Sequence, residues 1–233
     1  MNPSPARAYI RFYAELNDHL DAQDRHRDLE HEFFVPASVK DTIESFGVPH
    51  SEVELVLVNG DSSDFSRVLR DGDRISVYPV FESLDITPEL RVRRHALRDP
   101  RFVLDVHLGR LAAYLRMLGF DTVYRNYAGD PELVRISVGE KRILLTRDRG
   151  LLMHSAITHG YWLRETDSRR QTAEVVHRFD LARSVRPFTR CMVCNHPLPE
   201  APTRQCPGCG RLYWQGSHYV RMQGWIAQLV SQD

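Results

Sequence analysis

The sequence predicts an α/β protein built on a parallel sheet, with a β-rich domain before it and a small four-cysteine segment after it. Two apolar runs, which end at Asp105 and Asp148, are typical of short buried strands. Between them leucines and alanines recur at helical spacing, and Gly119 follows as a helix-ending residue, which completes a strand–helix–strand unit. Two C-x-x-C pairs near the C-terminus predict a separate small ribbon.

The first 85 residues predict a domain of strand–strand–helix–strand–strand order. Alternation and β-branched residues indicate strands at 8–16, 31–35, 53–58 and 74–79, and Ser38 is the expected N-cap of the helix. Asn59-Gly60 is a hairpin turn signal, and Asp71-Gly72-Asp73 precedes the last strand. The acidic stretch 17–32 is expected to be a solvated loop, although its histidines leave a metal site as the alternative.

The central part continues the alternation of strands and helices. Asp130 and Pro131 are the expected N-cap and first residue of a helix, and Asp167 is favoured as the N-cap of another. Further elements are expected as strands at 101–105, 120–124, 141–148 and 161–164, and as helices at 108–118, 150–157, 169–179 and 220–229.

Acidic residues follow the strands of this predicted sheet. In open α/β sheets ligands bind outside the carboxyl ends of the strands, where Asp105 and Asp148 would project, and the helix start at Asp130 faces the same region. Glu165 follows the next strand and is a candidate fourth acid. Such carboxylates suit Mg²⁺ or Mn²⁺ and metal-assisted phosphodiester cleavage. The alternative is that these acids only end strands or cap helices.

Basic side chains lie close to these acids in the sequence. Arg147 and Arg149 flank Asp148, and Arg110 lies one helical turn beyond the strand that ends at Asp105. They could bind substrate phosphate, or they could form salt bridges with the acids. His107 could contact a metal or a base, or simply lie near the site.

The four cysteines are Cys191, Cys194, Cys206 and Cys209, two C-x-x-C pairs with eleven residues between them. This spacing predicts a structural Zn²⁺ held by four thiolates, and disulfides are the alternative. The rest of the chain is expected to survive loss of this zinc because it has its own cores. Trp214, just after the second pair, is a candidate for stacking on RNA bases, unless it packs the ribbon.

Charge is divided unevenly along the chain. Residues 1–90 hold 8 Lys and Arg against 18 Asp and Glu, a net −10, whereas 91–185 hold 18 against 11 (+7) and 186–233 hold 5 against 2 (+3). A polyanion such as RNA is therefore expected to bind residues 91–233. The acidic first part could bind a basic partner or cover the basic part, or its acids could simply be solvated.

The segments LDVHLGRLAAYLRMLGFDT and ILLTRDRGLL, followed by the four cysteines, resemble the Mut7-C RNase family, a branch of the PIN-like nucleases. The resemblance spans about residues 100 to 225. It implies that Asp105, Asp130 and Asp148 are metal-binding acids of a ribonuclease. His107 departs from the small residue expected after such an aspartate.

Residues 6–82, with Val-Asn-Gly and Leu-x-Asp-Gly-Asp-x-Ile-Ser-Val-Tyr-Pro, resemble the ubiquitin-like sulfur carriers of thiamine and molybdopterin synthesis. Those carriers act through a free C-terminal Gly-Gly, whereas here the chain continues through Phe81-Glu-Ser-Leu-Asp-Ile. Sulfur carriage is therefore not expected, and the domain is interpreted as a ubiquitin-like module of the kind that also occurs with Mut7-C domains.

Together these patterns predict a ubiquitin-like β-grasp domain (1–85), a linker (86–100), a PIN-like parallel-sheet domain (101–185) and a zinc ribbon with a C-terminal helix (186–233). The expected function is a Mg²⁺- or Mn²⁺-dependent ribonuclease, endo- or exonucleolytic, with Asp105, Asp130, Asp148 and Glu165 as its acids. The alternative is a non-catalytic adaptor that binds RNA, the ribosome or a protein. No apolar run approaches a membrane span and no leader pattern opens the chain, so a cytoplasmic location is expected.

Overall fold

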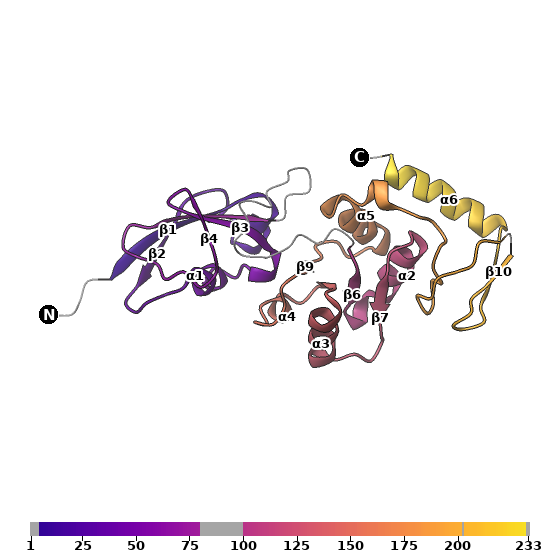
Figure 1. The fold of residues 1–233 in the computed structure, drawn as a ribbon. Coiled ribbons are helices and arrows are strands. Elements are labelled where there is room, and N and C mark those ends of the chain that lie inside the picture. The colour runs from indigo at the N-terminus through magenta and orange to yellow at the C-terminus, as the bar shows by residue number, and fades with distance from the viewer. Residues whose placement is uncertain (1–4, 80–99, 202, 232–233) are drawn as a thin grey trace. The chain divides into compact units, whose positions relative to one another are not determined.

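The computed structural model describes residues 5–79, 100–201 and 203–231, and the chain divides into two compact units, 1–98 and 99–233 (Figure 1). The predicted linker 86–100, apart from Pro100, lies outside the described residues. The segments 101–185 and 186–233, predicted as separate parts, belong to the same compact unit.

The N-terminal unit is a β-grasp fold, as predicted. In chain order its elements are β1 (Ala6–Phe12), a 3₁₀ helix η1 (Ala14–His19), β2 (Leu29–Phe33), α1 (Val39–Ser45), a 3₁₀ helix η2 (His50–Glu52), β3 (Val53–Val58), β4 (Asp61–Ser63) and β5 (Arg74–Pro79). The sheet order is β2-β1-β5-β3-β4, with the central pair β1 and β5 parallel and the other pairs antiparallel. Val39 and Ile43 of α1 are buried with the inward side chains of β1, β3 and β5.

Two N-terminal predictions were wrong in detail. The strand expected at 8–16 ends at Phe12, because Ala14 adopts a left-handed φ of 47° and opens a 3₁₀ helix. The acidic stretch 17–32 is not all solvated loop, since β2 begins at Leu29 and His19 is buried. His19 Nε2 lies 2.8 Å from Glu52 Oε2, which ties this stretch to the start of β3.

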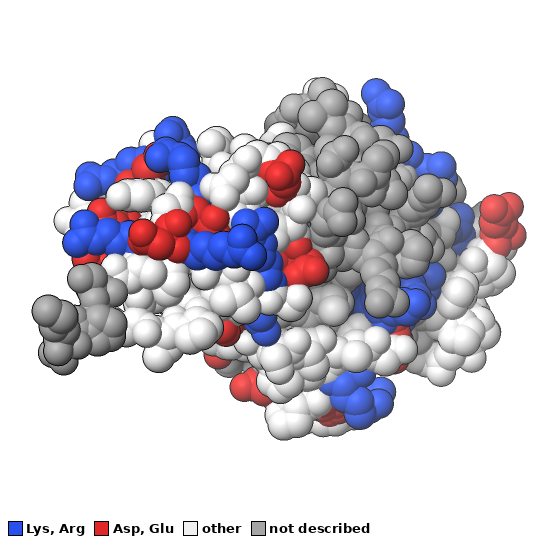
Figure 2. Space-filling model, turned by 60° about the vertical axis from the view of Figure 1, so that its left-hand side comes forward, with Lys and Arg blue, Asp and Glu red and all other residues white. Residues whose placement is uncertain are grey.

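Several acids of the N-terminal unit are paired on its own surface. Arg7 forms ion pairs with Glu30 at 3.4 Å and with Glu32 at 2.9 Å, and Asp28 pairs with both Arg11 and Arg74. Figure 2 shows a face on which basic and acidic side chains lie interleaved. These three arginines and three acids balance one another, so the net −10 of this part comes from other residues.

The C-terminal unit contains a four-stranded parallel sheet of order β7-β6-β8-β9, which confirms the predicted parallel α/β arrangement. In chain order it comprises β6 (Phe102–Leu104), a 3₁₀ helix η4 (Val106–Leu108), α2 (Gly109–Met117), β7 (Thr122–Tyr124), α3 (Asp130–Glu140), β8 (Ile143–Thr146), α4 (Arg149–Leu152), β9 (Gly160–Trp162), α5 (Ser168–Arg178), a 3₁₀ helix η5 (Ala182–Ser184), β10 (Thr203–Gln205), β11 (Leu212–Trp214) and α6 (Ser217–Val230).

The two faces of this sheet are covered by different helices. Val103 of β6 and Leu144 of β8 pack in one apolar cluster with residues of α3 and α4. The alternate residue Phe102 meets Phe179, at the end of α5, with ring centroids 5.9 Å apart, and α5 packs against α2. Because successive strand residues point to opposite faces, both faces are buried, and continuous apolar strands are the result.

Two helix predictions differ from the structure. The helix expected at 150–157 is only the four-residue α4, which is followed by a turn. The N-cap of α3 is Gly129 rather than Asp130, so that Asp130 and Pro131 are its first two residues. An acidic residue in the first turn still interacts favourably with the positive end of the helix.

The cysteine ribbon, residues 186–214, and α6 pack against the sheet domain. The backbone N–H groups of Arg186 and Phe188 donate to the carbonyls of Leu118 and Met117, each at 2.8 Å. Farther along, the ring of Trp225 on α6 lies 5.1 Å from that of Tyr114 on α2. The ribbon is thus hydrogen-bonded to the C-terminal end of α2. Within the described residues, no helix has both the length and the apolar character needed to cross a bilayer.

Gly119 lies where α2, the sheet and the ribbon meet. Its φ of +99° is a conformation that L side chains rarely adopt, and a Cβ atom there would lie 2.3 Å from the carbonyl oxygen of Arg186. Glycine therefore allows both the turn out of α2 and the close approach of the ribbon backbone.

Replacement of Gly119 by alanine is expected to lower the free energy of unfolding of the C-terminal unit by about 2–5 kcal/mol, because it adds backbone strain and a steric overlap. Gly139→Ala is the matched control: Gly139 lies in α3 with open space around its Cβ position, so alanine there should raise stability by about 0.5–1 kcal/mol. Urea unfolding followed by circular dichroism measures both. Equal effects of the two substitutions would contradict this account of Gly119.

Candidate active site and cysteine cluster

Three of the predicted acids line one cavity. Its volume is about 690 Å³, and it lies at the carboxyl ends of β6 and β8 and at the N-terminus of α3. Its lining residues are Asp105, Val106, His107, Ala128, Gly129, Asp130, Arg147, Asp148, Arg149 and Gly150. Parallel pairing of Leu104 with Leu145 brings the two strand ends to the same edge, so the aspartates that follow them are neighbours. This space is called the acidic cavity below.

Thr146 links two of these aspartates. Its hydroxyl donates to Asp105 Oδ2 at 2.8 Å and accepts from the backbone N–H of Asp148 at 2.9 Å. Asp105 Oδ1 also accepts from the N–H of Val106 at 2.6 Å. Sequence reasoning assigned no role to Thr146, although a lone hydroxyl at the end of an apolar strand was a usable signal. It is fully buried and fixes the orientation of the Asp105 carboxylate.

A second contact missed from the sequence supports the segment after Asp105. Tyr124 at the end of β7 donates its hydroxyl to the carbonyl of Val106 at 2.8 Å. The Tyr124 hydroxyl would lie 2.8 Å from a Cβ atom at Gly109, so any other residue there would push the ring away from the start of α2.

Asp148 both caps a helix and lines the cavity. Its Oδ1 accepts from the N–H of Gly150 at 2.7 Å and caps the short helix α4. The side chain is nevertheless exposed and lines the cavity. The capping alternative is therefore correct for Asp148, but it does not remove the carboxylate from the cavity.

The predicted basic residues are divided between locations. Arg147 and Arg149 line the acidic cavity, and the Arg149 guanidinium lies 5.1 Å from the centre of the Trp162 ring. Arg110 is exposed in the first turn of α2 but does not line the cavity. Trp214 is 69% exposed and lines a different cavity, formed by the ribbon and α6.

Glu165 does not join the other predicted acids. It lies three residues beyond β9 and is not among the residues that line the acidic cavity. Its N–H donates to Glu174 Oε2 of α5 at 3.1 Å, and its carboxylate lies 4.0 Å from Arg170. Its segment is thus held toward α5, which corrects its place in the predicted site. Asp167 caps α5, accepting from two backbone N–H groups, as predicted.

The oxygen donors of the acidic cavity are chemically suited to hard divalent cations. They do not form a complete ligand cage by themselves: among the described residues, only the four cysteines, whose ligand atoms lie within 4.8 Å of one another, make a group of three or more that could hold a metal ion. An ion held by the aspartates would therefore complete its shell with water or substrate oxygens, as Mg²⁺ commonly does.

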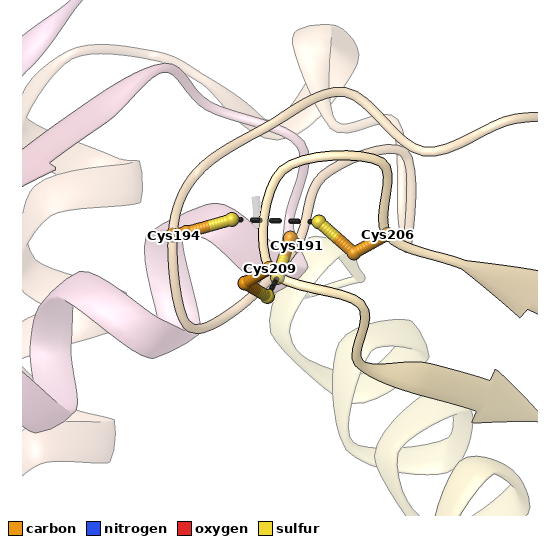
Figure 3. Close-up of side chains that lie close together, drawn as sticks. All are labelled: Cys191, Cys194, Cys206 and Cys209. Atoms are coloured by element: carbon orange, nitrogen blue, oxygen red, sulfur yellow. Dashed lines mark hydrogen bonds between the residues drawn. The ribbon is translucent and has the colours of Figure 1, made fainter.

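The four cysteine sulfurs converge on one point, as Figure 3 shows. The Sγ atoms of Cys194 and Cys206 are 3.4 Å apart, and those of Cys191 and Cys209 are 3.6 Å apart. These separations exceed the ~2.05 Å of a disulfide bond and are close to the ~3.8 Å edge expected for a tetrahedral Zn–S₄ site. The cysteines are free thiols whose arrangement could hold a metal ion.

Electrostatics within the cluster also favours a bound cation. Burial opposes ionisation of Cys191, but hydrogen bonds from the Tyr213 hydroxyl at 3.1 Å and from backbone groups lower its pKa to about 6. Burial, with neighbouring thiols, raises the pKa of Cys194 to about 12. The Cys191 thiol therefore ionises more readily than that of Cys194, and a bound cation would offset the repulsion that a second thiolate would meet.

The first cysteine pair is held by a buried arginine of α2. The Arg116 guanidinium donates to the carbonyls of Val193 at 2.7 Å and Met192 at 3.2 Å, both between Cys191 and Cys194. Its Nε also donates to the carbonyl of Thr122 at the start of β7. The same side chain therefore joins helix, sheet and ribbon.

Asp121, between α2 and β7, forms a second junction. Its Oδ1 accepts from Arg142 at 2.8 Å and from the Asn195 side chain at 2.7 Å, and Arg190 lies 3.8 Å from Oδ2. Burial alone would raise the pKa of Asp121, but the hydrogen bonds from Arg142 and Asn195 outweigh it and hold that pKa below its ordinary value. Sequence reasoning missed this residue because its partners lie far along the chain.

Comparison with known families agrees with the predicted order of domains. Residues 100–205 match the family model of the Mut7-C RNAse domain, and residues 6–85 match that of the Mut7-C ubiquitin domain. The predicted family assignment is therefore confirmed for both parts. The first match ends at Gln205, so the second cysteine pair and α6 lie beyond it. No curated protein matches the chain.

Solved structures resemble the chain over about a third of its length. Two crystal structures of small archaeal modifier protein 1 from Haloferax volcanii are 18% and 16% identical to it, with TM-scores of 0.26 and 0.27. The matches cover 32% and 34% of this chain and 97% and 99% of those chains. A putative molybdopterin converting factor, subunit 1, from Pyrococcus furiosus is 22% identical, with 32% and 97% coverage and a TM-score of 0.25.

Substitution of Asp121 by asparagine is expected to lower the free energy of unfolding of the C-terminal unit by about 1–3 kcal/mol at pH 7. Because the pKa of Asp121 is lowered by folding, its contribution is present above the ordinary carboxyl pKa of about 4 and is lost as pH falls below it. The difference from wild type should therefore shrink below pH ~4. Urea unfolding at pH 7 and at pH 3.5 measures it, with the exposed Asp180→Asn as control. A difference that is constant with pH would contradict the assigned role.

Proposed function

We propose that this chain, in which a Mut7-C ubiquitin domain precedes a Mut7-C RNAse domain, is a metal-dependent ribonuclease that cleaves RNA at the acidic cavity. The observation that carries the proposal is the meeting of Asp105, Asp130 and Asp148 at one cavity on the carboxyl edge of a parallel sheet. Ligand sites of open α/β sheets lie at this edge. A cluster of carboxylates repels a polyanionic substrate unless a cation lies between the carboxylates and the phosphates.

The three aspartates would hold Mg²⁺ or Mn²⁺. When bound, such an ion activates water and screens the charge of the backbone phosphate. Carboxylate ligands fit these hard cations better than they fit softer metals, and the cavity offers no thiol.

The other side chains of the cavity have distinct proposed roles. Thr146 and the N–H of Val106 orient Asp105, so that its lone pairs need little rearrangement on binding. Arg147 and Arg149 would neutralise substrate phosphate, since guanidinium groups bind phosphate in a bidentate manner. Arg110 would contact the RNA strand outside the cavity. Glu165 is left out of the proposed site because it does not line the cavity.

Substitution of Asp148 by asparagine is expected to abolish Mg²⁺- or Mn²⁺-dependent cleavage of single-stranded RNA, with a loss of at least about 100-fold. Asparagine can still accept the N–H of Gly150 and cap α4, so the fold should persist. Asp180→Asn is the matched control, since Asp180 is exposed, lines neither cavity and has a φ of 43° that asparagine tolerates. Cleavage of a labelled RNA with and without each cation is the measurement.

If wild type and the Asp148 variant show the same trace cleavage, the activity comes from a contaminant. The chain would then be better described as a non-catalytic adaptor that binds RNA, the ribosome or a protein. This alternative is favoured by the observation that, among the described residues, only the four cysteines and not the three aspartates form a group that could hold a metal ion.

For the cysteine cluster, we propose a structural Zn²⁺. Four thiolates leave no open position for substrate, and Cys₄ sites with C-x-x-C pairs are typical of structural zinc. Arg116 of α2 donates to the carbonyl of Val193, and the Asn195 side chain accepts from the N–H of Thr122 in β7, so both bonds would connect the metal site to the sheet domain. Loss of zinc is therefore expected to destabilise the sheet domain as well, although the sequence alone predicted that this domain would be unaffected because it has its own core.

Freshly purified protein is expected to contain about one equivalent of zinc, and Cys206→Ser should lose most of it. Amide hydrogen exchange should then rise at Gly119 and Phe120, whose surroundings depend on the ribbon, but not in β3 of the N-terminal unit. Metal analysis and exchange mass spectrometry measure the two effects. Zinc well below half an equivalent in wild type, or full zinc in the variant, would rule out the site.

The partner of the N-terminal unit is a separate proposal. Its excess of acids favours a basic protein surface, including that of a ribosome, while the basic residues 91–233 would bind RNA. Glu30 and Glu32 are already paired with Arg7, so other acids of the unit would have to meet a basic partner.

A further inference from the structure

A second cavity lies between the ribbon, α2 and the start of α6. Its volume is about 510 Å³, and it shares no lining residue with the acidic cavity. Aromatic side chains dominate one part of it: Phe188 and Tyr219 have ring centroids 4.5 Å apart, and Tyr213 and Trp214 of β11 line it as well. Trp214 is 69% exposed and Leu212 beside it 54%. Large exposed apolar groups at the rim of a cavity indicate a binding surface.

The charged groups of this cavity are all basic. Arg190, Arg204 and Arg211 line it, and no aspartate or glutamate does. Arg190 and Arg204 donate to backbone carbonyls, which holds both side chains in place; Arg190 is also paired with Asp121, so most of the positive charge comes from Arg204 and Arg211. Arg211 is exposed at the start of the strand that carries Trp214. The cavity is therefore complementary to an anion.

The N-terminus of α6 contributes to the same cavity. Gly216, Ser217 and His218 line it, and α6 is fourteen residues long with no side-chain hydrogen bond at its N-cap. The first N–H groups of a helix and its dipole favour a phosphate or carboxylate. This feature acts together with the three arginines and the aromatic rings, so the site does not depend on the helix end alone.

We propose that this cavity binds a nucleotide unit of single-stranded RNA, with the base stacked on Trp214 and the adjoining phosphate near Arg211 and the start of α6. Aromatic faces accept any base, and basic groups follow the backbone. The choice of RNA rests on the proposed ribonuclease function. A nucleotide fits better than an acidic peptide because it combines a planar ring with a fixed anionic group next to it.

Helix α2 connects this site to the acidic cavity. His107, two residues before α2, lines the acidic cavity, whereas Ala113 of α2 lines the aromatic one. The chain between His107 and Ala113 therefore borders both cavities, and one RNA strand could contact both.

The test measures binding of fluorescein-labelled U₁₀ RNA to the full-length, zinc-loaded protein by anisotropy, at low salt and without added divalent cation. Trp214→Ala is expected to raise Kd by about 5- to 150-fold, and Trp214→Phe to restore it to within about 3-fold, because stacking needs only an aromatic face. Phe34→Ala, which removes an exposed ring from the N-terminal unit, is the aromatic control and should leave Kd unchanged.

A second pair of variants tests the charge without altering the aromatic rings. Arg211→Gln should reduce the slope of log Kd against log salt by about 0.7, the value for one phosphate contact on a single strand. Arg183→Gln is the matched control, since Arg183 is exposed and lines neither cavity. Its slope should equal that of wild type.

Unchanged RNA binding in both Trp214→Ala and Arg211→Gln would overturn the proposal. So would Trp214-dependent binding of a labelled Glu-Tyr copolymer together with RNA binding that does not depend on Trp214, because the cavity would then be a protein-docking surface. The assay contains no cation, so it does not depend on cleavage. Trp214-dependent RNA binding in a protein that never cleaves RNA would refute the nuclease proposal and leave this site standing.

Discussion

The carboxylate of Asp121 binds two segments that are distant from it in the sequence: Arg142 just before β8, and Arg190 and Asn195 in the ribbon. A partly buried carboxylate loses hydration, but here the hydrogen bonds outweigh that cost, and the lowered pKa of Asp121 reports the balance. Because Asp121 lies between α2 and β7, its position depends on the tight turn at Gly119. The turn, the edge of the sheet and the ribbon are therefore mutually dependent, and the ribbon is a part of the domain rather than an appendage.

Helix α2 transmits this constraint to the acidic cavity. At its C-terminal end, Arg116 binds the carbonyls between the first two cysteines, and at its N-terminal end the chain enters from Asp105 through Val106. Tyr124 of β7 bonds to the carbonyl of Val106, so the strand that Asp121 anchors also supports the segment beside the acidic cavity. A metal in the ribbon would thus help to position the segment next to the proposed catalytic acids without touching substrate.

The two cavities have opposite electrostatic character, and the proposed chemistry needs both. Three aspartates repel RNA unless a cation lies between them, whereas the aromatic cavity presents arginines and a helix N-terminus and no carboxylate. An enzyme with two such cavities would bind most of the RNA strand at the aromatic cavity, where no metal is needed. It would place a single phosphate at the acidic cavity, where the metal would be held. The strand surface of the N-terminal unit differs from both cavities, since its charged residues Arg7 and Asp28 are already paired within the unit.

Local pattern determined much of this protein. Apolar runs and turn residues were enough to predict β3 and β5 to the residue, the parallel sheet, the cap at Asp167 and the cysteine pairs, because each depends on neighbours in sequence. Tertiary structure alone decided the rest. Thr146, Tyr124 and Asp121 act through partners 18 to 74 residues away, which no periodicity records. Glu165 follows a strand just as Asp148 does, yet its N–H bonds to Glu174 of α5 and the residue does not line the acidic cavity. Strand ends can be predicted from the sequence. Which of the acids that follow them meet at one cavity depends on packing between elements, and only the folded chain determines it.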